Sequence, residues 1–226
     1  MSILENNTLW IKEARLSFPH LLVAKPVNKG TPKFSCNFIL DQNSTEWAEA
    51  MQIVGQMASE KWAEKAQGVL NLISSDKRLR CYGTGAEKIS TQTGEIYEGY
   101  TDPGTVFLAA SNDSAPKLYG QDAQPLPPTA NANQMFVGGN YVAGLMSFWL
   151  QENEHGRAVR SNLIAVQYLR EGEHFGADEI DAASVFQAVP GAPAAPAAAP
   201  GMPGAAPAPA APAPLPGAAP RIDDFL

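Results

Sequence analysis

The sequence is poor in the residues that build metal sites, disulfide frameworks and many catalytic centres. It has only 2 Cys and 3 His in 226 residues. Cys36 and Cys81 are far apart and His20, His155 and His174 are scattered, whereas zinc sites need short paired spacings. We therefore expect two reduced thiols, no structural metal and no cofactor.

Nucleotide-binding and hydrolytic motifs are also lacking. The chain contains no GxxxxGK(S/T) phosphate loop, no GxGxxG, no HExxH and no GxSxG. Its acidic pairs, Asp178-Glu179 and Asp223-Asp224, are adjacent residues. Neighbouring side chains point apart on a strand or helix, so these pairs make poor two-metal clamps. The sequence therefore predicts a protein that is not an enzyme.

Long apolar runs and a secretory leader are missing as well. No stretch approaches the roughly 18 consecutive apolar residues that a transmembrane helix needs. The N-terminal MSILENNTLWIKEARLSF has no basic start followed by an apolar run, which a signal peptide requires. We expect no membrane association and a cytoplasmic location.

Charge is unevenly distributed along the chain. The net charge of −7 argues against a nucleic-acid partner. However, residues 1–90 carry 11 Lys and Arg against 9 Asp and Glu, whereas residues 91–189 carry 4 against 12. A positive groove on a negative body is one interpretation, and chance clustering on a solvated surface is the other.

Alternating apolar and polar residues predict an antiparallel, β-rich domain. Strands are expected at residues 8–18, 34–40, 105–111, 136–150 and 158–172. Gly138, Gly139 and Gly144 lie inside a strand pattern, where glycines fit sharp bends of a sheet. Residues 86–106 and 112–134 are expected to be loops, the second long enough to indicate a functional or mobile segment.

One amphipathic helix is expected to interrupt the strands. Asn43-Ser44-Thr45-Glu46 is a helix start signal, and apolar residues from Trp47 to Trp62 recur at helical spacing, to about residue 66. We interpret both tryptophans as core residues, and we expect a short closing helix over residues 176–186. A curled sheet of about five strands with one inserted helix predicts an OB-fold β-barrel, with an antiparallel α+β sandwich as the alternative.

Aromatic rings interleaved with positive charges indicate a surface for single-stranded nucleic acid. Phosphates need Lys and Arg, and each unstacked base that finds a flat ring gains roughly 1–3 kcal/mol. The candidate phosphate contacts are Lys12, Arg15, Lys25, Lys29, Lys33, Lys77, Arg78, Arg80, Lys88 and Lys117. The candidate stacking residues are Tyr82, Tyr97, Tyr100 and Tyr119. Burial in the core is the alternative for each ring.

A low-complexity segment separates the predicted domain from an acidic-aromatic tip. Residues 190–220 contain 14 Ala, 11 Pro and 4 Gly, so they cannot form a core, and their prolines favour an extended chain. We expect a folded domain at 1–187, a disordered linker at 188–220 and an interaction tip at 221–226. The interaction residues of the tip are Ile222, Asp223, Asp224, Phe225 and Leu226. The tip suits a basic-rimmed apolar pocket on another protein, or the nucleic-acid groove of its own domain.

This arrangement resembles single-stranded-DNA-binding (SSB) proteins, whose bacterial members end in an acidic tip with a terminal Phe; here Leu226 follows Phe225. The segments ARLSFPHL (14–21), YEGY (97–100) and FVGGNYVAG (136–144) resemble a family of bacteriophage-encoded SSB proteins. The resemblance covers roughly residues 8–176. It implies an OB fold related to the replicative SSB protein of coliphages of the T-seven type, and sequence-independent binding of single-stranded DNA (ssDNA).

The sequence and the resemblance together predict a phage protein that coats ssDNA in the host cell cytoplasm during DNA replication, recombination and repair. Its tip would recruit phage or host replication and recombination proteins. Two alternatives stay open: a strand-annealing recombination protein, and a protein-interaction adaptor that binds no nucleic acid. The oligomeric state is also open, with a homodimer among the options.

Overall fold

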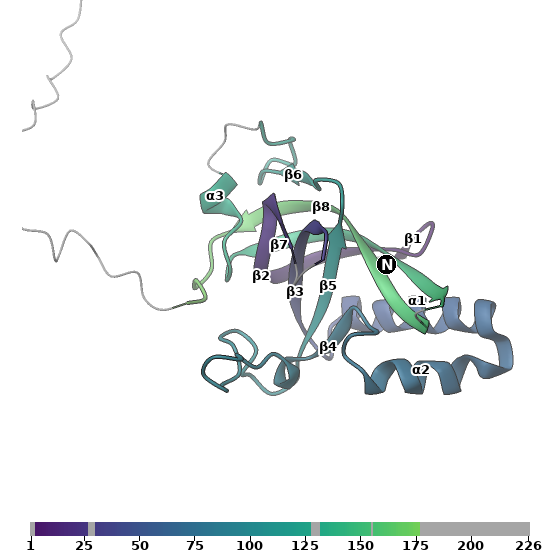
Figure 1. Cartoon of the computed structure of the whole chain (residues 1–226). Coiled ribbons are helices and arrows are strands. Elements are labelled where there is room, and N and C mark those ends of the chain that lie inside the picture. The colour runs from purple at the N-terminus through teal and green to yellow at the C-terminus, as the bar shows by residue number, and fades with distance from the viewer. Residues whose placement is uncertain (1–2, 27–29, 128–131, 155, 177–226) are drawn as a thin grey trace, which may run out of the picture. The chain divides into compact units, whose positions relative to one another are not determined.

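A computed structural model of the chain describes residues 3–26, 30–127, 132–154 and 156–176 (Figure 1). Its strands are β1 Ile3–Leu4, β2 Thr8–Pro26, β3 Pro32–Asp41, β4 Tyr82–Thr84, β5 Thr105–Asn112, β6 Lys117–Tyr119, β7 Tyr141–Asn153 and β8 Gly156–Arg170. Its helices are α1 Thr45–Trp62, α2 Ala66–Ser75 and α3 Ala132–Met135, with 3-10 turns at Ala63–Lys65 and Gly85–Glu87.

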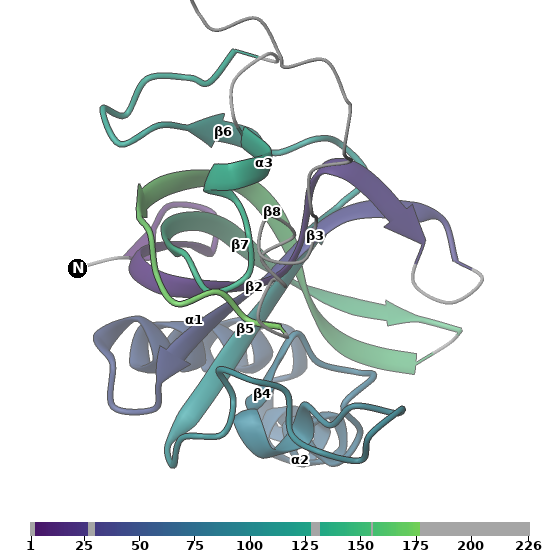
Figure 2. The same cartoon turned by 90° about the vertical axis from the view of Figure 1, so that its left-hand side faces the viewer.

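Five of these strands close into a barrel (Figure 2). β3 pairs antiparallel with β2 and β5, while β7 pairs antiparallel with β2 and β8. A parallel bridge between Ser111 of β5 and Asn162 of β8 completes the ring. This topology confirms the predicted OB-fold barrel rather than the α+β sandwich.

Register shifts bend the long strands so that the ring can close. They interrupt β2–β3 pairing between Ser17 and His20, and β7–β8 pairing between Leu145 and Met146. Such bulges increase local twist and curvature. Gly144, one of the predicted bend glycines, lies beside the second shift, and a Cβ there would approach the ring of Phe38 to 2.5 Å. The barrel interior therefore has room only for glycine at this position.

The barrel interior is filled by side chains that alternate along the strands. The fully buried residues include Leu16, Phe38, Leu108, Val142 and Met146, one or two from each of four barrel strands. Because successive side chains of a strand point to opposite faces, the residues between them face outward. That alternation decides which side chains are available to a ligand.

A helical segment from Thr45 to Ser75 is inserted between β3 and β5, as predicted, and continues beyond the expected end. Ser44 caps α1, and its Oγ accepts a hydrogen bond from the Trp47 N–H at 3.2 Å. α1 ends at Trp62, after which Ala63 has a φ of 45° and the chain turns into α2. Trp62 is buried and Trp47 packs against the core, so both are core residues as expected.

Several expected segments differ from the structure or lie outside it. The expected loop at residues 112–134 contains β6 and α3. The expected helix over residues 176–186 lies outside the described residues except for Gly176, as do the linker and the tip. No helix in the described ranges combines the length and apolarity that a membrane span needs.

Candidate nucleic-acid interface

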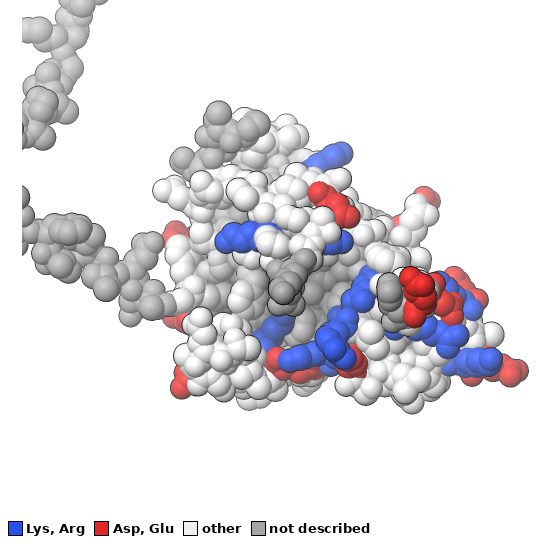
Figure 3. All heavy atoms as spheres, in the orientation of Figure 1, with Lys and Arg blue, Asp and Glu red and all other residues white. Residues whose placement is uncertain are grey.

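A groove of about 830 Å³ lies over the outer face of β3 and β5 and continues to the β7–β8 hairpin. We call it the β3–β5 groove. Lys and Arg side chains gather around a hollow on this face of the molecule (Figure 3). The position follows from strand alternation: Phe38 and Leu108 point into the barrel, so their neighbours line the outer face.

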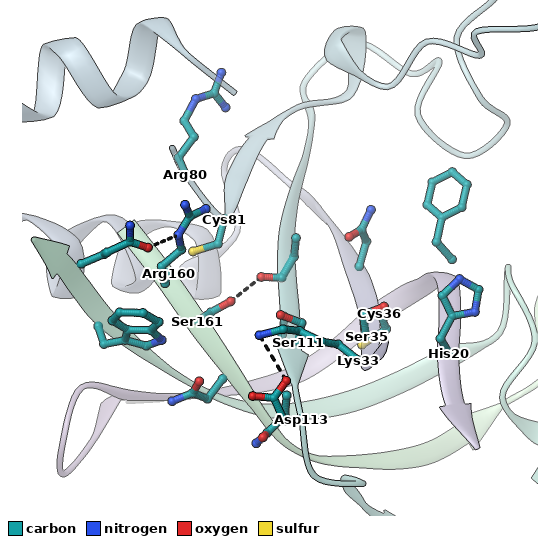
Figure 4. Close-up of a pocket in the computed structure, with 18 of the residues that line it drawn as sticks. His20, Lys33, Ser35, Cys36, Arg80, Cys81, Ser111, Asp113, Arg160 and Ser161 are labelled. Carbon is teal, nitrogen blue, oxygen red and sulfur yellow. Dashed lines mark hydrogen bonds and ion pairs between the residues drawn. The ribbon is translucent and has the colours of Figure 1, made fainter. Parts of the chain in front are cut away.

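The floor of the groove consists of small side chains. Ser35 and Asn37 come from β3, Ala109 and Ser111 from β5, and Ser161 from β8 (Figure 4). Ser161 Oγ donates a hydrogen bond to the Ala109 carbonyl at 2.6 Å. Asn37 Nδ2 donates to the Tyr100 hydroxyl at 3.0 Å. The floor is therefore largely polar, and hydrogen bonds hold two of its side chains in place.

Two aromatic rings are exposed at the groove and belong to different strands. Phe18 of β2 is 40% exposed and Trp149 of β7 is 41% exposed. Phe18 has a φ of 47°, in the left-handed region that non-glycine residues rarely adopt, and it lies in the β2–β3 register shift. Strained backbone of this kind concentrates at functional sites. Its ring packs edge-on against Tyr97, with 5.0 Å between ring centroids.

The charged side chains that line the groove are mainly cationic. Among the described residues they comprise Lys33, Arg80, Lys88 and Arg160, against a single carboxylate, from Asp113. Lys33 Nζ lies 3.3 Å from Asp113 Oδ1. Arg160 is the cross-strand partner of Trp149, and its Nη1 donates to the Arg78 carbonyl at 2.8 Å. A ring and a cation are thus placed side by side on the β7–β8 hairpin.

Arg80 is held in place by several acceptors. Its Nη2 lies 2.8 Å from Glu87 Oε2, its Nε donates to the Ser74 carbonyl at 3.2 Å, and its Nη1 donates to the Tyr82 carbonyl. Only 11% of this side chain is exposed. Arg80 therefore fixes the β4 region against α2 and presents little of its guanidinium to the groove.

Lys88 has an unusual environment for a cation. Its Nζ lies 4.1 Å from the centroid of the Phe107 ring and 5.7 Å from that of Phe18. Burial lowers the pKa of this ammonium from 10.5 to about 8, and Glu87 counteracts only part of the effect. A phosphate beside Lys88 would favour the charged form.

A smaller hollow of about 340 Å³ adjoins the β3–β5 groove and shares Arg80, Lys88 and Ala109 with it. Five of the residues predicted from the sequence line it: Lys77, Arg80, Tyr82, Lys88 and Tyr97. Together with Lys33, the two hollows bring together six predicted contacts that are spread over residues 33–97. Their role in binding stays a prediction.

Other predicted contacts lie elsewhere. Lys12 is exposed at the β2–β7 register shift and lines none of these hollows. Arg15 lies 4.3 Å from the Phe175 ring centroid and donates from Nη2 to the Glu173 carbonyl, which ties down the chain after β8. Its Nε donates to the Gly139 carbonyl, before β7, at 3.2 Å. Tyr100 is only 1% exposed, so no face of its ring is open to a base.

The remaining predicted contacts are exposed, paired or outside the described residues. Lys25 is exposed near the end of β2, opposite Lys33. Arg78 forms an ion pair of 2.7 Å with Asp76 and holds the pKa of that carboxyl at about 2. Lys117 and Tyr119 line a separate groove of about 590 Å³ between the outer part of β2 and the loop that carries β6, which we call the apolar groove. Leu, Pro, Ala and Tyr side chains line it, and Lys117 is its one charged residue in the described part of the chain. Lys29 and the tip residues Ile222, Asp223, Asp224, Phe225 and Leu226 lie outside the described residues.

The residues predicted from the sequence do not include the aromatic, histidine and arginine side chains Phe18, His20, Trp149 and Arg160, which line the groove. The alternation of side chains along a strand could have identified Trp149. Its neighbour Phe148 is buried, so Trp149 must point to the opposite, outer face. Arg160 could also have been predicted, because the position of the β7–β8 turn fixes the register and pairs Arg160 with Trp149. Phe18 lies near Lys12 and Arg15 in the sequence, but alternation along the strand could not predict its direction because a local bulge sets it.

The two cysteines also line the β3–β5 groove, as free thiols. Burial raises the pKa of both, that of Cys81 to about 12. Neither thiol is therefore a reactive thiolate at neutral pH. Within the described ranges, no group of three or more His, Cys, Asp or Glu residues is placed to hold a metal ion.

Comparison with known proteins gives a consistent result. The structure of the single-stranded DNA-binding protein from bacteriophage Enc34 is 18% identical, has a TM-score of 0.56, and matches over 81% of this chain and 92% of that one. The same protein in complex with ssDNA gives 18% identity and a TM-score of 0.52, over 76% and 91%. These two structures share the fold. A weaker likeness, with a TM-score of 0.45 and 8% identity over 80% and 94%, is to gp2.5, a single-stranded DNA binding protein encoded by bacteriophage T7.

Structural similarity at 18% identity shows only a shared fold, whereas a match to a sequence-family model shows membership of that family. A search of curated proteins gave no match. A family model described as "Enterobacter phage Enc34, ssDNA-binding protein" matches residues 7–194, which is most of the chain. The chain belongs to this Enc34 family of phage ssDNA-binding proteins.

Proposed function

We propose that this protein binds ssDNA without sequence preference and that the β3–β5 groove is the binding site. The observation that carries the proposal is the combination, in one groove, of exposed Phe18 and Trp149, four cationic residues and a floor of small side chains. Family membership supports it, and so does the neighbouring fold solved in complex with ssDNA. The face formed by the second and third strands of an OB fold is a recurrent oligonucleotide surface.

The groove supplies each interaction that an unpaired strand needs. Phe18 and Trp149 offer ring faces to two bases, and stacking tolerates any base because every base has a π-face. Lys33 and Arg160 would neutralise phosphates, and Lys88 would gain charge when a phosphate approaches. Stacking and phosphate contacts carry no sequence information, so binding is expected to be independent of sequence and to weaken with salt.

We further propose that the protein coats ssDNA in the cytoplasm of the infected host during phage DNA replication, recombination and repair. The domain at 1–187 would bind the strand, and the tip at 221–226 would recruit replication or recombination proteins. The support for recruitment is compositional: in the sequence, an uncharged Ala/Pro/Gly segment separates two carboxylates and three large apolar residues from the predicted domain.

Fluorescence anisotropy of the full-length chain with a labelled oligonucleotide tests the proposal. We expect tight binding to several unrelated ssDNA sequences at low salt, and weak competition by duplex DNA. No binding to any ssDNA at low salt would exclude this function and favour the adaptor, which the net charge of −7 supports. An annealing assay with complementary oligonucleotides separates a coating protein from an annealing protein.

A further inference from the structure

Tyr100 is buried beside the β3–β5 groove, where no base can reach it, yet its ring contacts an exposed ring of that groove. It lies roughly parallel to Phe18, with 6.2 Å between the ring centroids and 23° between the ring planes. The buried ring of Phe107 meets Tyr100 edge-on, with 6.0 Å between the centroids. Both arrangements are favoured geometries for aromatic pairs. Tyr100 therefore connects the protein interior to the ring that Phe18 presents to the groove.

The hydroxyl of Tyr100 lies where Phe18 leaves the regular pairing of β2 with β3. Ser17 and Asn37 are cross-strand partners, and theirs is the last regular pair before the register shift that contains Phe18. Asn37 Nδ2 donates a hydrogen bond to the Tyr100 hydroxyl at 3.0 Å. Burial raises the pKa of this hydroxyl, and hydrogen bonds with Ser17 and Asn37 counteract part of the rise. Tyr100 is thus bonded to both strands at the start of the bulge.

The segment YEGY (97–100) forms the turn that carries Tyr100 to this position. The Tyr100 N–H donates to the Tyr97 carbonyl at 3.1 Å, and Gly99 has a φ of 79°. A positive φ at the third residue of a four-residue turn is a geometry in which glycine is preferred. The same turn brings Tyr97 edge-on to Phe18. The two tyrosines of one turn therefore contact a single ring in two different geometries.

Phe18 requires such contacts because its backbone conformation is unfavourable. Its φ of 47° lies in the left-handed region, which phenylalanine rarely adopts. A strained conformation of this kind persists only where the surrounding structure imposes it. The surrounding structure here is the ring of Tyr100, the ring of Tyr97 and the hydrogen bonds at Ser17. Without Tyr100, we expect the backbone to relax and to turn the Phe18 ring away from the groove.

We propose that Tyr100 is a positioning residue for ssDNA binding, which holds the Phe18 ring in the orientation that stacks on a base. The proposal rests on the proposed function of the β3–β5 groove, because it takes Phe18 as a base contact. It adds that this contact depends on a side chain that ssDNA does not touch. A ring that is fixed before binding loses less conformational freedom when a base stacks on it, so positioning raises affinity.

Fluorine NMR of the full-length chain without DNA tests the positioning directly. Phe18 is replaced by para-fluorophenylalanine, whose resonance is expected to differ from that of the unfolded chain because two tyrosine rings surround the fluorinated ring. Tyr100→Leu should move the resonance toward the unfolded value. Tyr100→Phe is a milder variant that keeps the ring and loses the hydrogen bonds, and it should move the resonance less, in the same direction. An unchanged resonance in a folded variant of either kind would overturn the proposal.

A double-mutant cycle measures the consequence for ssDNA affinity. Phe18→Ala removes the stacking ring and should weaken binding about tenfold. Tyr100→Leu should weaken binding about fivefold while Phe18 is present, and should cause no further loss once Phe18 is alanine. Additive losses would overturn the proposal, because Tyr100 would then affect binding independently of Phe18. An unchanged affinity in Tyr100→Leu would overturn it as well.

Phe136→Leu provides a matched control for the loss of a buried ring. Phe136 is 5% exposed, packs edge-on against Tyr168 and lines neither hollow of the candidate interface. Phe136→Leu should leave the fluorine resonance and the ssDNA affinity unchanged, and equal effects in Tyr100→Leu and Phe136→Leu would overturn the proposal. Failure of the parent chain to bind ssDNA would exclude the proposed function and this role together. Binding by the parent chain with additive losses would exclude this role alone.

Discussion

The β3–β5 groove and the apolar groove are built on the same barrel from different outward-facing residues. In the part of the chain that the structure describes, the first has four cations, one carboxylate and a floor of Ser, Asn and Ala side chains. The second has Lys117 among Leu, Pro and Ala side chains. Both contain aromatic rings, so aromatic content alone does not distinguish them.

The difference shows how charge and side-chain size select a ligand on a common scaffold. A phosphate that enters the apolar groove would lose hydration and meet a single cation, which is unfavourable. An apolar peptide over the β3–β5 groove would cover polar floor groups such as Ser111 without replacing their water contacts. We therefore expect the apolar groove to disfavour phosphates and the β3–β5 groove to disfavour apolar peptides, and the variants below test that separation.

The largest expected effect concerns two tryptophans of similar exposure. Trp149→Ala should weaken ssDNA binding by roughly 5- to 150-fold, because a stacked base contributes roughly 1–3 kcal/mol. Trp10 is 44% exposed on β2 but lines neither groove, so Trp10→Ala should leave affinity nearly unchanged. Anisotropy titrations of the two variants at one salt concentration check this. Equal losses of ssDNA affinity in the two variants would show that bases do not stack specifically in the β3–β5 groove.

The second effect is a pH dependence that originates at Lys88. Its pKa of about 8 in the free protein means that the ammonium is mostly charged at pH 7 and about one-tenth charged at pH 9. If the charged form binds phosphate, binding takes up a proton, and affinity falls by at most about tenfold from pH 7 to pH 9. Lys88→Arg stays charged over this range and should give a nearly flat profile. Parallel pH profiles for the two proteins would contradict the role of Lys88.

Much of the fold followed from local sequence signals. The cap at Ser44 and the helical spacing up to Trp62 predict α1 because both act within a few residues. The second helix was not predicted, because the chain turns at Ala63 through a positive φ. Alanine rarely adopts a positive φ, so its presence there does not indicate a turn. β6 escaped prediction because three residues without a periodic pattern pair with a strand about fifty residues away.

The site was predicted less completely because the barrel decides which residues meet. Lys33, Arg80 and Lys88 share one groove through pairings across β3, β4 and β5. Tyr97 and Tyr100 lie in the same segment of the sequence and were both predicted to stack on bases. Tyr100 is buried with Ile39 and Phe107, whereas Tyr97 is exposed. Neighbouring charges and rings in sequence therefore identified only some of the side chains that line the groove, and their role in binding stays a prediction.

A third effect separates two arginines of the same hairpin. Arg160 lines the β3–β5 groove, whereas Arg157 forms an ion pair of 2.6 Å with Glu152 outside it. Arg160→Gln should weaken ssDNA binding about fivefold at low salt. It should also reduce the slope of log affinity against log salt by about 0.7, the value for one phosphate on a single strand. Arg157→Gln should change neither quantity, and an equal change of slope would show that net charge matters rather than position.

The smallest effect is expected from Lys117, and it compares the two grooves directly. Lys117 and Lys33 were both predicted as phosphate contacts, but the structure places them in different grooves. Lys33→Gln and Lys117→Gln remove the same charge, so any general attraction of the protein for DNA falls equally in both. Lys33→Gln should weaken binding about fivefold, partly because the carboxylate of Asp113 then has no neighbouring cation and repels the phosphates of the bound ssDNA. Lys117→Gln should change affinity by less than about twofold. Similar losses in both variants would mean that ssDNA extends over the apolar groove, and the separation of the two sites would then be wrong.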